Sequence, residues 1–336
     1  MKTKVLAGIV ALLGLTTGLA ACGGGDENGP VTIYSGREEE LVAPLFERYE
    51  EETGNEVEVR YGDSAELAAT ILEEGENTPA DVFFSQDAGA LGALEKEGSF
   101  SELGEDVLGR VDARYRSRDG RWVGASGRAR VIAYDSRELS PSELPASVLD
   151  LTDPEWEGRV GWAPTNGSFQ AFVTALRLSE GDEAAREWLE QMDENGTETF
   201  ADNSSIRDAI AAGEIDLGLI NHYYVAQAQA EEGPGYPVKV HFPRGGDAGA
   251  MINVAGAGVL TASEKQEAAG EFVEFLLSPQ AQRFFVEETK EYPLIDGIEA
   301  DPRVVPLSEI EQPQIDLSNL DDLQGTVKLI EESGAL

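Results

Sequence analysis

Two adjacent tyrosines carry the most distinctive chemistry in this 336-residue chain. Tyr223 and Tyr224 follow Asn221 and His222 directly after the apolar run 215–220. The run predicts a buried strand, and at the strand-to-helix turn beyond it both rings can face one site. Paired phenolates are hard oxygen donors that suit a small, highly charged cation such as Fe³⁺, which must displace their protons. A tyrosine pair by itself is more often core packing or surface, so its meaning depends on the rest of the chain.

Residues for other site chemistries are scarce. His222 and His241 are the only histidines and Cys22 is the only cysteine, which excludes a zinc site built on histidines and thiolates. The sequence has no Walker-type phosphate loop, no Gly-x-Ser-x-Gly elbow and no recognisable nucleophile–base set. It therefore predicts a binding protein and not an enzyme.

Strands and helices alternate through the amino-terminal part of the chain. Period-two apolar patterns predict strands at 31–34, 57–61 and 81–84, and helical spacing predicts helices at 41–52, 64–74 and 88–97. This alternation predicts a parallel sheet covered on both faces, with the functional residues at the carboxyl ends of the strands.

A second α/β pattern follows a β-rich stretch at 122–134, where the chain is predicted to leave the first lobe. Strands are expected at 160–162 and 215–220, and helices at 169–178, 183–194 and 206–212. The Gly- and Ala-rich stretch 245–259 is predicted to cross back, and helices 263–277 and 279–288 to complete the first lobe. A last helix at about 320–332 is expected to pack on the second lobe.

The predicted organisation is thus two α/β lobes. The amino-terminal lobe comprises 31–126 plus about 258–300, and the carboxyl-terminal lobe 127–257 plus about 301–336. Two lobes joined by more than one crossing form a hinge with an interlobe cleft, which is a favoured ligand site that closes around its ligand.

The amino terminus carries an export signal. Lys2 and Lys4 precede an apolar run at 5–19, and Leu-Ala-Ala-Cys ends at Cys22. This order predicts a signal peptide at 1–21, and the run is too short for a convincing membrane span. Leu-Ala-Ala-Cys resembles the bacterial lipobox, which implies acylation of Cys22, for example with palmitate, followed by a flexible tether at 22–30. An ordinary signal peptide with an incidental thiol is the alternative.

The chain is strongly acidic, with 64 Asp and Glu against 25 Lys and Arg and a formal net charge of −39. Removing 1–21 takes away Lys2 and Lys4 and no acid, so the mature chain carries −41. Repulsion therefore disfavours nucleic acids and anionic lipid headgroups as partners. Charge alone identifies no ligand, because a solvated acidic surface explains it equally well.

Five ordered blocks give the tyrosine pair its context. The blocks are Tyr34-Ser35-Gly36-Arg37-Glu38, Thr78-Pro79-Ala80-Asp81-Val82-Phe83-Phe84, Ser126-Gly127-Arg128-Ala129-Arg130-Val131, Pro164-Thr165-Asn166-Gly167-Ser168-Phe169 and Asn221-His222-Tyr223-Tyr224, with Glu291-Tyr292-Pro293-Leu294 near the end. Together they closely resemble the ferric-ion-binding proteins of bacterial ABC importers, which are often compared to transferrin, over about Val31 to Ile295. The resemblance implies a type II periplasmic-binding-protein-like fold and a lipoprotein that captures Fe³⁺ outside the cytoplasm, as a monomer, for an ABC permease.

The resemblance implies iron ligation by Tyr223 and Tyr224, but the first-lobe ligands depart from the family pattern. Glu38 stands where a histidine is usual, and Gln86, with Asp87 beside it, stands where a glutamate is usual. Carboxylates of Glu38 or Asp87 can replace them, since carboxylates also suit Fe³⁺. Glu38 is alternatively a helix-start acid favoured by the helix dipole.

A synergistic anion, phosphate or carbonate, is also implied. The loop Asn166-Gly167-Ser168 matches the family's anion loop, Asn203 and Asn221 match further anion contacts, and Arg128 stands where a cation balances the charge. The loop is alternatively a simple helix cap. Where some relatives carry a third tyrosine, this chain has Phe169, which cannot coordinate.

Fold does not fix ligand, so a small organic solute such as a polyamine, thiamine or a phosphonate is the rival. An aromatic-lined site for an organic cation would draw on Tyr34, Tyr61, Phe84 and Tyr223.

Overall fold

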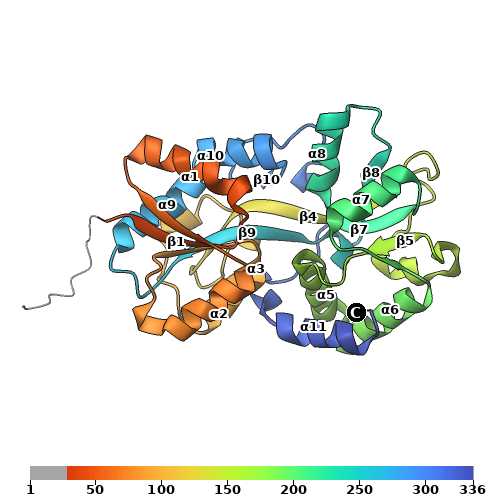
Figure 1. Cartoon of the computed structure of the whole chain (residues 1–336), viewed down its shortest axis with the longest axis horizontal. Helices are drawn as coiled ribbons and strands as arrows, with labels where there is room; N and C mark the ends of the chain where they lie inside the picture. Colours follow the sequence, from red (N-terminus) through yellow and green to blue (C-terminus); the bar gives the residue numbers. More distant parts are fainter. Residues whose placement is uncertain (1–28, 336) are drawn as a thin grey trace, which may run out of the picture.

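The computed structural model describes residues 29–335 and has two lobes side by side, as Figure 1 shows. The predicted signal peptide 1–21, Cys22 and most of the tether 22–30 lie outside the described residues. The first lobe contains β1 (Val31–Ser35), α1 (Glu39–Thr53), β2 (Val57–Tyr61), α2 (Ser64–Glu74), β3 (Val82–Ser85), α3 (Ala88–Lys96), α4 (Glu105–Leu108), β9 (Ile252–Val259), α9 (Gln266–Leu276), α10 (Pro279–Phe284) and β10 (Tyr292–Pro293). The predicted two-lobed α/β architecture is confirmed.

The second lobe is built from the middle of the chain and its end. It contains β5 (Val160–Trp162), α5 (Gly167–Glu180), α6 (Asp182–Glu194), β6 (Glu198–Thr199), α7 (Asn203–Ala212), β7 (Leu217–Asn221), α8 (His222–Glu232), β8 (Val238–His241) and α11 (Leu323–Glu332). The final helix α11 packs against α5 and α6, as predicted. In Figure 1 it lies along the lower edge of this lobe.

The strands follow the order β2-β1-β3-β9-β4-β7-β5-β6, with β8 and β10 also paired to β4. Strands β1, β2 and β3 are parallel within the first lobe, and β5, β6 and β7 are parallel within the second. Strand β9 is antiparallel to β3 and β4, and β4 (Val123–Asp135) is antiparallel to β7. The predicted parallel pairing of the first three strands is confirmed, whereas β4 and β9, for which no direction was predicted, run antiparallel because they carry the chain out of the first lobe and back again.

Strand β4 belongs to both lobes. It pairs with β9 as far as Ala129 and with β7 from Arg130 onward. Beside this change of partner the Arg130 N–H donates to the Met251 carbonyl oxygen at 2.8 Å. The pairing thus changes lobe at 129–130 and 251–252, a few residues from the predicted boundaries at 126–127 and 257–258.

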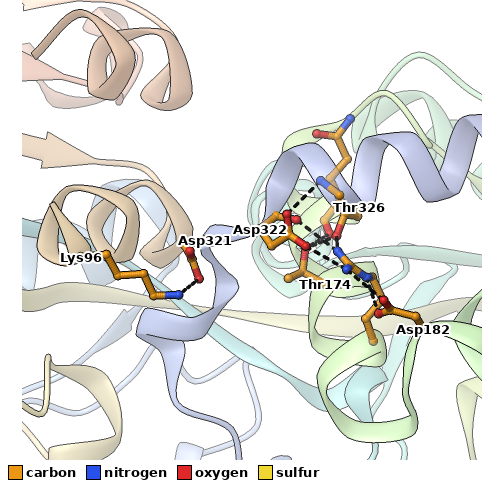
Figure 2. Close-up of polar contacts among 9 residues, drawn as sticks. Lys96, Thr174, Asp182, Asp321, Asp322 and Thr326 are labelled. Carbon is orange, nitrogen blue, oxygen red and sulfur yellow. Dashed lines mark hydrogen bonds and ion pairs between the residues drawn. The ribbon is translucent and has the colours of Figure 1, made fainter. Parts of the chain in front are cut away.

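A third link between the lobes is made by the carboxyl-terminal strap, residues 312–335. Its 3-10 turn Leu317–Asp321 packs on α3 of the first lobe, whereas α11 packs on the second. Figure 2 shows the changeover: Asp321 lies 2.6 Å from Lys96 Nζ of α3, while Asp322 lies with the second-lobe residues Thr174, Asp182 and Thr326. The Arg177 guanidinium of α5 donates to Asp322 Oδ2 at 2.9 Å. The sequence analysis assigned all of about 301–336 to the second lobe, whereas the turn Leu317–Asp321 packs on the first.

The strap can pack this closely on α3 because residue 92 is a glycine. A Cβ at Gly92 would lie 2.1 Å from the Ser318 carbonyl oxygen, so a side chain must displace the strap backbone. We expect Gly92→Ala to lower the free energy of unfolding by about 1–3 kcal/mol, measured by urea denaturation. The matched control is Gly270→Ala in α9, where a Cβ meets nothing within 4 Å. There we expect a gain of about 0.5–1 kcal/mol from helix propensity, and equal losses at both sites would contradict the argument.

Across residues 29–335, no helix combines the length and apolarity that a membrane span requires.

Candidate metal and anion site

The tyrosine pair lies where strand β7 turns into helix α8. Asn221 ends the strand in extended conformation and caps the helix, and Tyr223 and Tyr224 occupy its first turn. Their rings stack with centroids 4.3 Å apart and an interplanar angle of 28°, and both are half-buried. The two phenols thus lie side by side at the predicted strand-to-helix turn.

The surroundings of the pair keep Tyr224 protonated in the absence of a cation. Burial raises the pKa of Tyr224 strongly, the charge and hydroxyl of Tyr223 raise it further, and the charge of Glu38 adds to the effect. The Arg128 charge lowers it but is outweighed. A phenol with such a raised pKa ionises only when a stronger positive charge replaces its proton. The site therefore suits a multivalent cation and couples its binding to proton release.

Residues from the first lobe reach the same point. Glu38 is exposed directly before α1, where its side chain makes no capping bond, and its charge acts on both Tyr224 and Arg37. The Arg37 guanidinium is in turn influenced by Tyr223. The structure thus brings Glu38 near the phenols and leaves its carboxylate free of helix capping.

Of the other two first-lobe candidates, Asp87 uses its carboxylate as a helix cap, and Gln86 makes its hydrogen bond through the backbone. Asp87 caps α3, where its Oδ1 accepts the Ala90 N–H at 3.0 Å, and burial raises the pKa of its carboxyl group. Gln86 donates its backbone N–H to Ser64 Oγ at 3.0 Å. Asp87 is therefore explained by its structural role, and its ligand role has less support than that of Glu38.

The predicted anion residues form a single hydrogen-bonded network at the start of α5. Asn166 caps the helix, and its Oδ1 accepts the Ser168 N–H at 3.0 Å, the Ser168 hydroxyl at 2.5 Å and the Asn203 amide at 3.2 Å. A Cβ on Gly167 would meet only open space, so this side of the loop is accessible. The structure brings these residues together with Asn221.

The guanidinium that organises this network is Arg130, which the sequence reasoning missed. It donates to Ser168 Oγ at 3.2 Å, Asn203 Oδ1 at 3.2 Å and Asn221 Oδ1 at 3.3 Å. Burial lowers the pKa of Arg130 to about 9, although the phenols Tyr224 and Tyr223 act to raise it. Arg130 forms no salt bridge among the described residues, so this buried cation attracts a negative partner.

Arg128, which the sequence did assign, lies two residues away on the same face of β4 and is 3% exposed. Its Nε has no hydrogen-bond partner in the part of the chain that the structure describes, while its charge lowers the pKa of Asp87, Tyr224 and Glu291. Arg128 thus acts through its charge near the phenols, and Arg130 makes the hydrogen bonds to the loop.

A buried ion pair supports the first-lobe side. The Arg37 guanidinium donates to Glu291 Oε1 at 2.8 Å with both side chains at most 2% exposed, and Ser126 donates to the other carboxylate oxygen. The block containing Glu291 was noticed in the sequence without a role, because the partners are 254 positions apart.

Several aromatic residues weighed in the sequence belong to the core. Phe169 is fully buried and packs edge-on against Trp162 with centroids 5.7 Å apart. Tyr34 and Phe84 are buried in the first-lobe core, and the Tyr34 hydroxyl donates to Glu74. Tyr61 stacks on Phe46, and among the described residues the Tyr223 ring contacts are with His222 and Tyr224, which disfavours the aromatic-lined site suggested for an organic cation.

Residues 29–335 contain no group of three or more His, Cys, Asp or Glu side chains placed to hold a metal ion.

Comparisons with known proteins agree with this geometry. Residues 77–316 match the family described as bacterial extracellular solute-binding protein. The chain is 33% identical to the "Fe(3+)-binding periplasmic protein" of Serratia marcescens, over 91% of this chain and 90% of that protein. It is also 33% identical to the "Major ferric iron-binding protein" of Neisseria meningitidis, over 90% and 92% of the two chains.

Solved structures show the same fold. Iron-bound HitA from Pseudomonas aeruginosa superposes with a TM-score of 0.84 at 31% identity, covering 91% of this chain and 99% of that one. The Trichodesmium protein IdiA (FutA), in complex with iron and citrate ligands, gives a TM-score of 0.80 at 29% identity and covers 91% and 99%. The chain therefore belongs to the bacterial extracellular solute-binding proteins, in the same family as these periplasmic ferric iron-binding proteins.

Proposed function

We propose that this chain captures Fe³⁺ between its lobes, with a synergistic anion, and delivers it to an ABC permease. The observation that carries the proposal is the stacked pair Tyr223 and Tyr224 at the end of β7, with Glu38 of the first lobe within electrostatic reach. Phenolates and carboxylates are the hard donors that Fe³⁺ prefers. The names of the similar proteins from Serratia and Neisseria support the same cargo.

Charge balance explains how the parts work together. Two phenolates and one carboxylate neutralise a trivalent ion, so an added anion needs its own positive partners. Arg130 supplies one through the network of Asn166, Ser168 and Asn221, and Arg128 supplies a second beside the phenols. Phosphate or carbonate held at the start of α5 would fill the iron positions that the protein leaves open. Closure is then driven by iron bonds that span both lobes.

Titration with ferric nitrilotriacetate, with and without phosphate or carbonate, tests the function. The proposal expects a visible tyrosinate-to-iron absorption band that saturates at one iron per chain and strengthens with the preferred anion. If no anion produces a band, the iron proposal fails, and a small organic solute becomes the better reading of the same fold.

The first-lobe ligand is tested by substituting each candidate carboxylate. Glu38→Gln is expected to lower iron affinity at least about tenfold, because it removes a charged donor while keeping the side-chain shape. Asp87→Asn keeps the cap of α3, since Asn caps a helix as well as Asp does. It therefore tests Asp87 as a ligand without unfolding the helix. Both are measured by competition with citrate.

The matched control is Glu39→Gln, an exposed acid one position further along α1. It changes the net charge equally and is expected to leave the affinity unchanged. A larger loss of iron affinity in Asp87→Asn than in Glu38→Gln would indicate that Asp87, at the start of α3, is the first-lobe ligand.

We further propose that the protein works as a monomer tethered to the membrane through an acyl group on Cys22. The lipobox-like sequence that ends at Cys22 supports this. Radiolabelled palmitate should label the wild-type chain in cells, and Cys22→Ser should abolish the label and release the protein.

A further inference from the structure

His222 is the residue through which the tyrosine helix contacts the rest of the molecule. Its side chain is buried, and its Nδ1 accepts the Ala129 N–H of β4 at 3.1 Å. Because Nδ1 accepts, the ring proton of the neutral imidazole lies on Nε2, which donates to the Lys290 carbonyl oxygen at 3.1 Å. One imidazole thus joins helix α8, strand β4 and the segment before β10.

The contact with that segment is more than a single hydrogen bond. The His222 ring stacks on Tyr292 with centroids 4.4 Å apart and an interplanar angle of 19°. Gln227, also on α8, donates to the Thr289 carbonyl oxygen at 3.3 Å. Lys290 between them has a φ of 60°, the only positive φ of a non-glycine residue in the described range. The segment 289–292 is therefore held in a specific shape against α8.

The position of these contacts coincides with the hinge. Ala129 is the last residue of β4 that pairs with β9, and the next residue is the first that pairs with β7. Tyr292 pairs with Gly127 on the first-lobe side of that point. The imidazole is consequently bonded to a second-lobe helix, to the changeover point and to a first-lobe segment.

The same segment also reaches the first-lobe half of the site. Glu291 binds the Arg37 guanidinium at 2.8 Å, and Arg37 precedes Glu38. Residues 290–292 therefore contact the chain neighbours of both candidate ligand sets, His222 before Tyr223 and Arg37 before Glu38.

We propose that His222 is a positioning residue, the pivot about which the second lobe turns. It fixes the tyrosine pair relative to the first-lobe side of the site while the lobes open and close. This inference rests on the proposed function for its effect on iron, but the pivot itself is a property of the iron-free protein.

Two substitutions separate the two hydrogen bonds of the imidazole. His222→Asn places an acceptor near the position of Nδ1 and so keeps the β4 bond, but loses the Lys290 bond and the stacking on Tyr292. His222→Gln reaches the position of Nε2 and retains the Lys290 bond. If His222 is the pivot, iron affinity should be highest in the wild type, lower in His222→Gln and lowest in His222→Asn. We expect at least about a tenfold loss of iron affinity in His222→Asn.

The matched control is His241→Asn, the same exchange at the other histidine. His241 Nε2 donates to the Pro145 carbonyl oxygen at 2.8 Å, and both residues lie in the second lobe. Its substitution removes a comparable bond and is expected to leave iron affinity and the absorption band as in wild type.

The iron-free readout is the distance between spin labels on the two lobes, measured by pulsed electron resonance. Leu72 on α2 and Leu178 on α5 are exposed leucines suited to Cys replacement, in a chain whose Cys22 is Ser. We expect a narrow distance distribution in wild type and His241→Asn, and a broader one in His222→Asn. If His222→Asn matches His241→Asn in this distribution, the pivot is overturned. If the wild type binds no iron, the proposed function fails, while the distance distributions still decide the pivot.

Discussion

Replacing both Tyr223 and Tyr224 with phenylalanine is expected to abolish the iron absorption band and lower iron affinity by more than about a hundredfold. The rings stack at 4.3 Å in the first turn of α8, so phenylalanine preserves the packing and removes only the hydroxyl donors. Loss of an outer-shell partner of a metal site already costs about 10–100-fold, and here two direct donors are lost. Isothermal titration with ferric nitrilotriacetate measures the affinity, and absorbance measures the band.

The same experiment has a pH signature. Burial and Tyr223 hold the pKa of Tyr224 well above its ordinary value, so the phenol is protonated when iron arrives and its proton must leave. Iron affinity should therefore rise with pH, with up to about two protons released by the pair per iron bound. The dependence of iron affinity on pH should be weaker in the variant with both Tyr223→Phe and Tyr224→Phe. Tyr236→Phe, a half-buried tyrosine beyond α8, is the control and should change neither quantity. An undiminished band in the double variant would remove the basis of the proposal.

Glu291→Gln is expected to lower the free energy of unfolding by about 3–5 kcal/mol, the largest stability loss that we foresee. The substitution leaves the Arg37 guanidinium, itself 2% exposed, without its carboxylate, and removes the countercharge of Arg128. Breaking one side of a buried pair strands the other charge, which is why the cost exceeds the net value of the pair. Urea denaturation of the wild type and of Glu291→Gln gives the difference in the free energy of unfolding.

The contribution of Glu291 also depends on pH. Burial alone would raise the pKa of Glu291, but the charges of Arg37 and Arg128 outweigh it and lower the pKa below its ordinary value. Stability from the ionised carboxylate is then present above the unfolded pKa and is lost as pH falls through the folded pKa. The gap between wild type and Glu291→Gln should narrow on acidification. Asp321→Asn, which breaks the surface pair with the half-exposed Lys96, is the control and should cost at most about 1 kcal/mol.

Local patterns in the sequence predicted most of the elements. Helix α2 and strand β5 begin and end at the predicted residues, because capping by Asp63 and a short apolar run mark those ends locally. The tyrosine pair was found because it follows a predicted strand, and the loop at Asn166 was found through the resemblance; each lies directly before or at the start of a helix. The comparisons confirm the family that these ordered motifs suggested.

What escaped prediction depends on contacts between distant parts of the chain. Arg130 is bonded to residues 38 to 91 positions away, and its role becomes visible only when β4 lies beside β7. The antiparallel crossing of β4 and β9 likewise has no local signature, since a continuous apolar run is the same in either direction. Asp87 shows the opposite situation, because a carboxylate next to a site motif also serves as the cap of α3. In each of these examples the role of the residue depends on which distant residues it contacts, and a single sequence does not contain that information.

The three links between the lobes have a consequence for how the molecule is made. β9, α9 and α10 complete the first lobe only after the whole middle of the chain has been synthesised, and α11 completes the second only at the carboxyl terminus. A nascent chain that has passed β8 therefore carries two unfinished cores and no finished lobe. We therefore expect neither lobe to complete its core until most of the chain has left the ribosome.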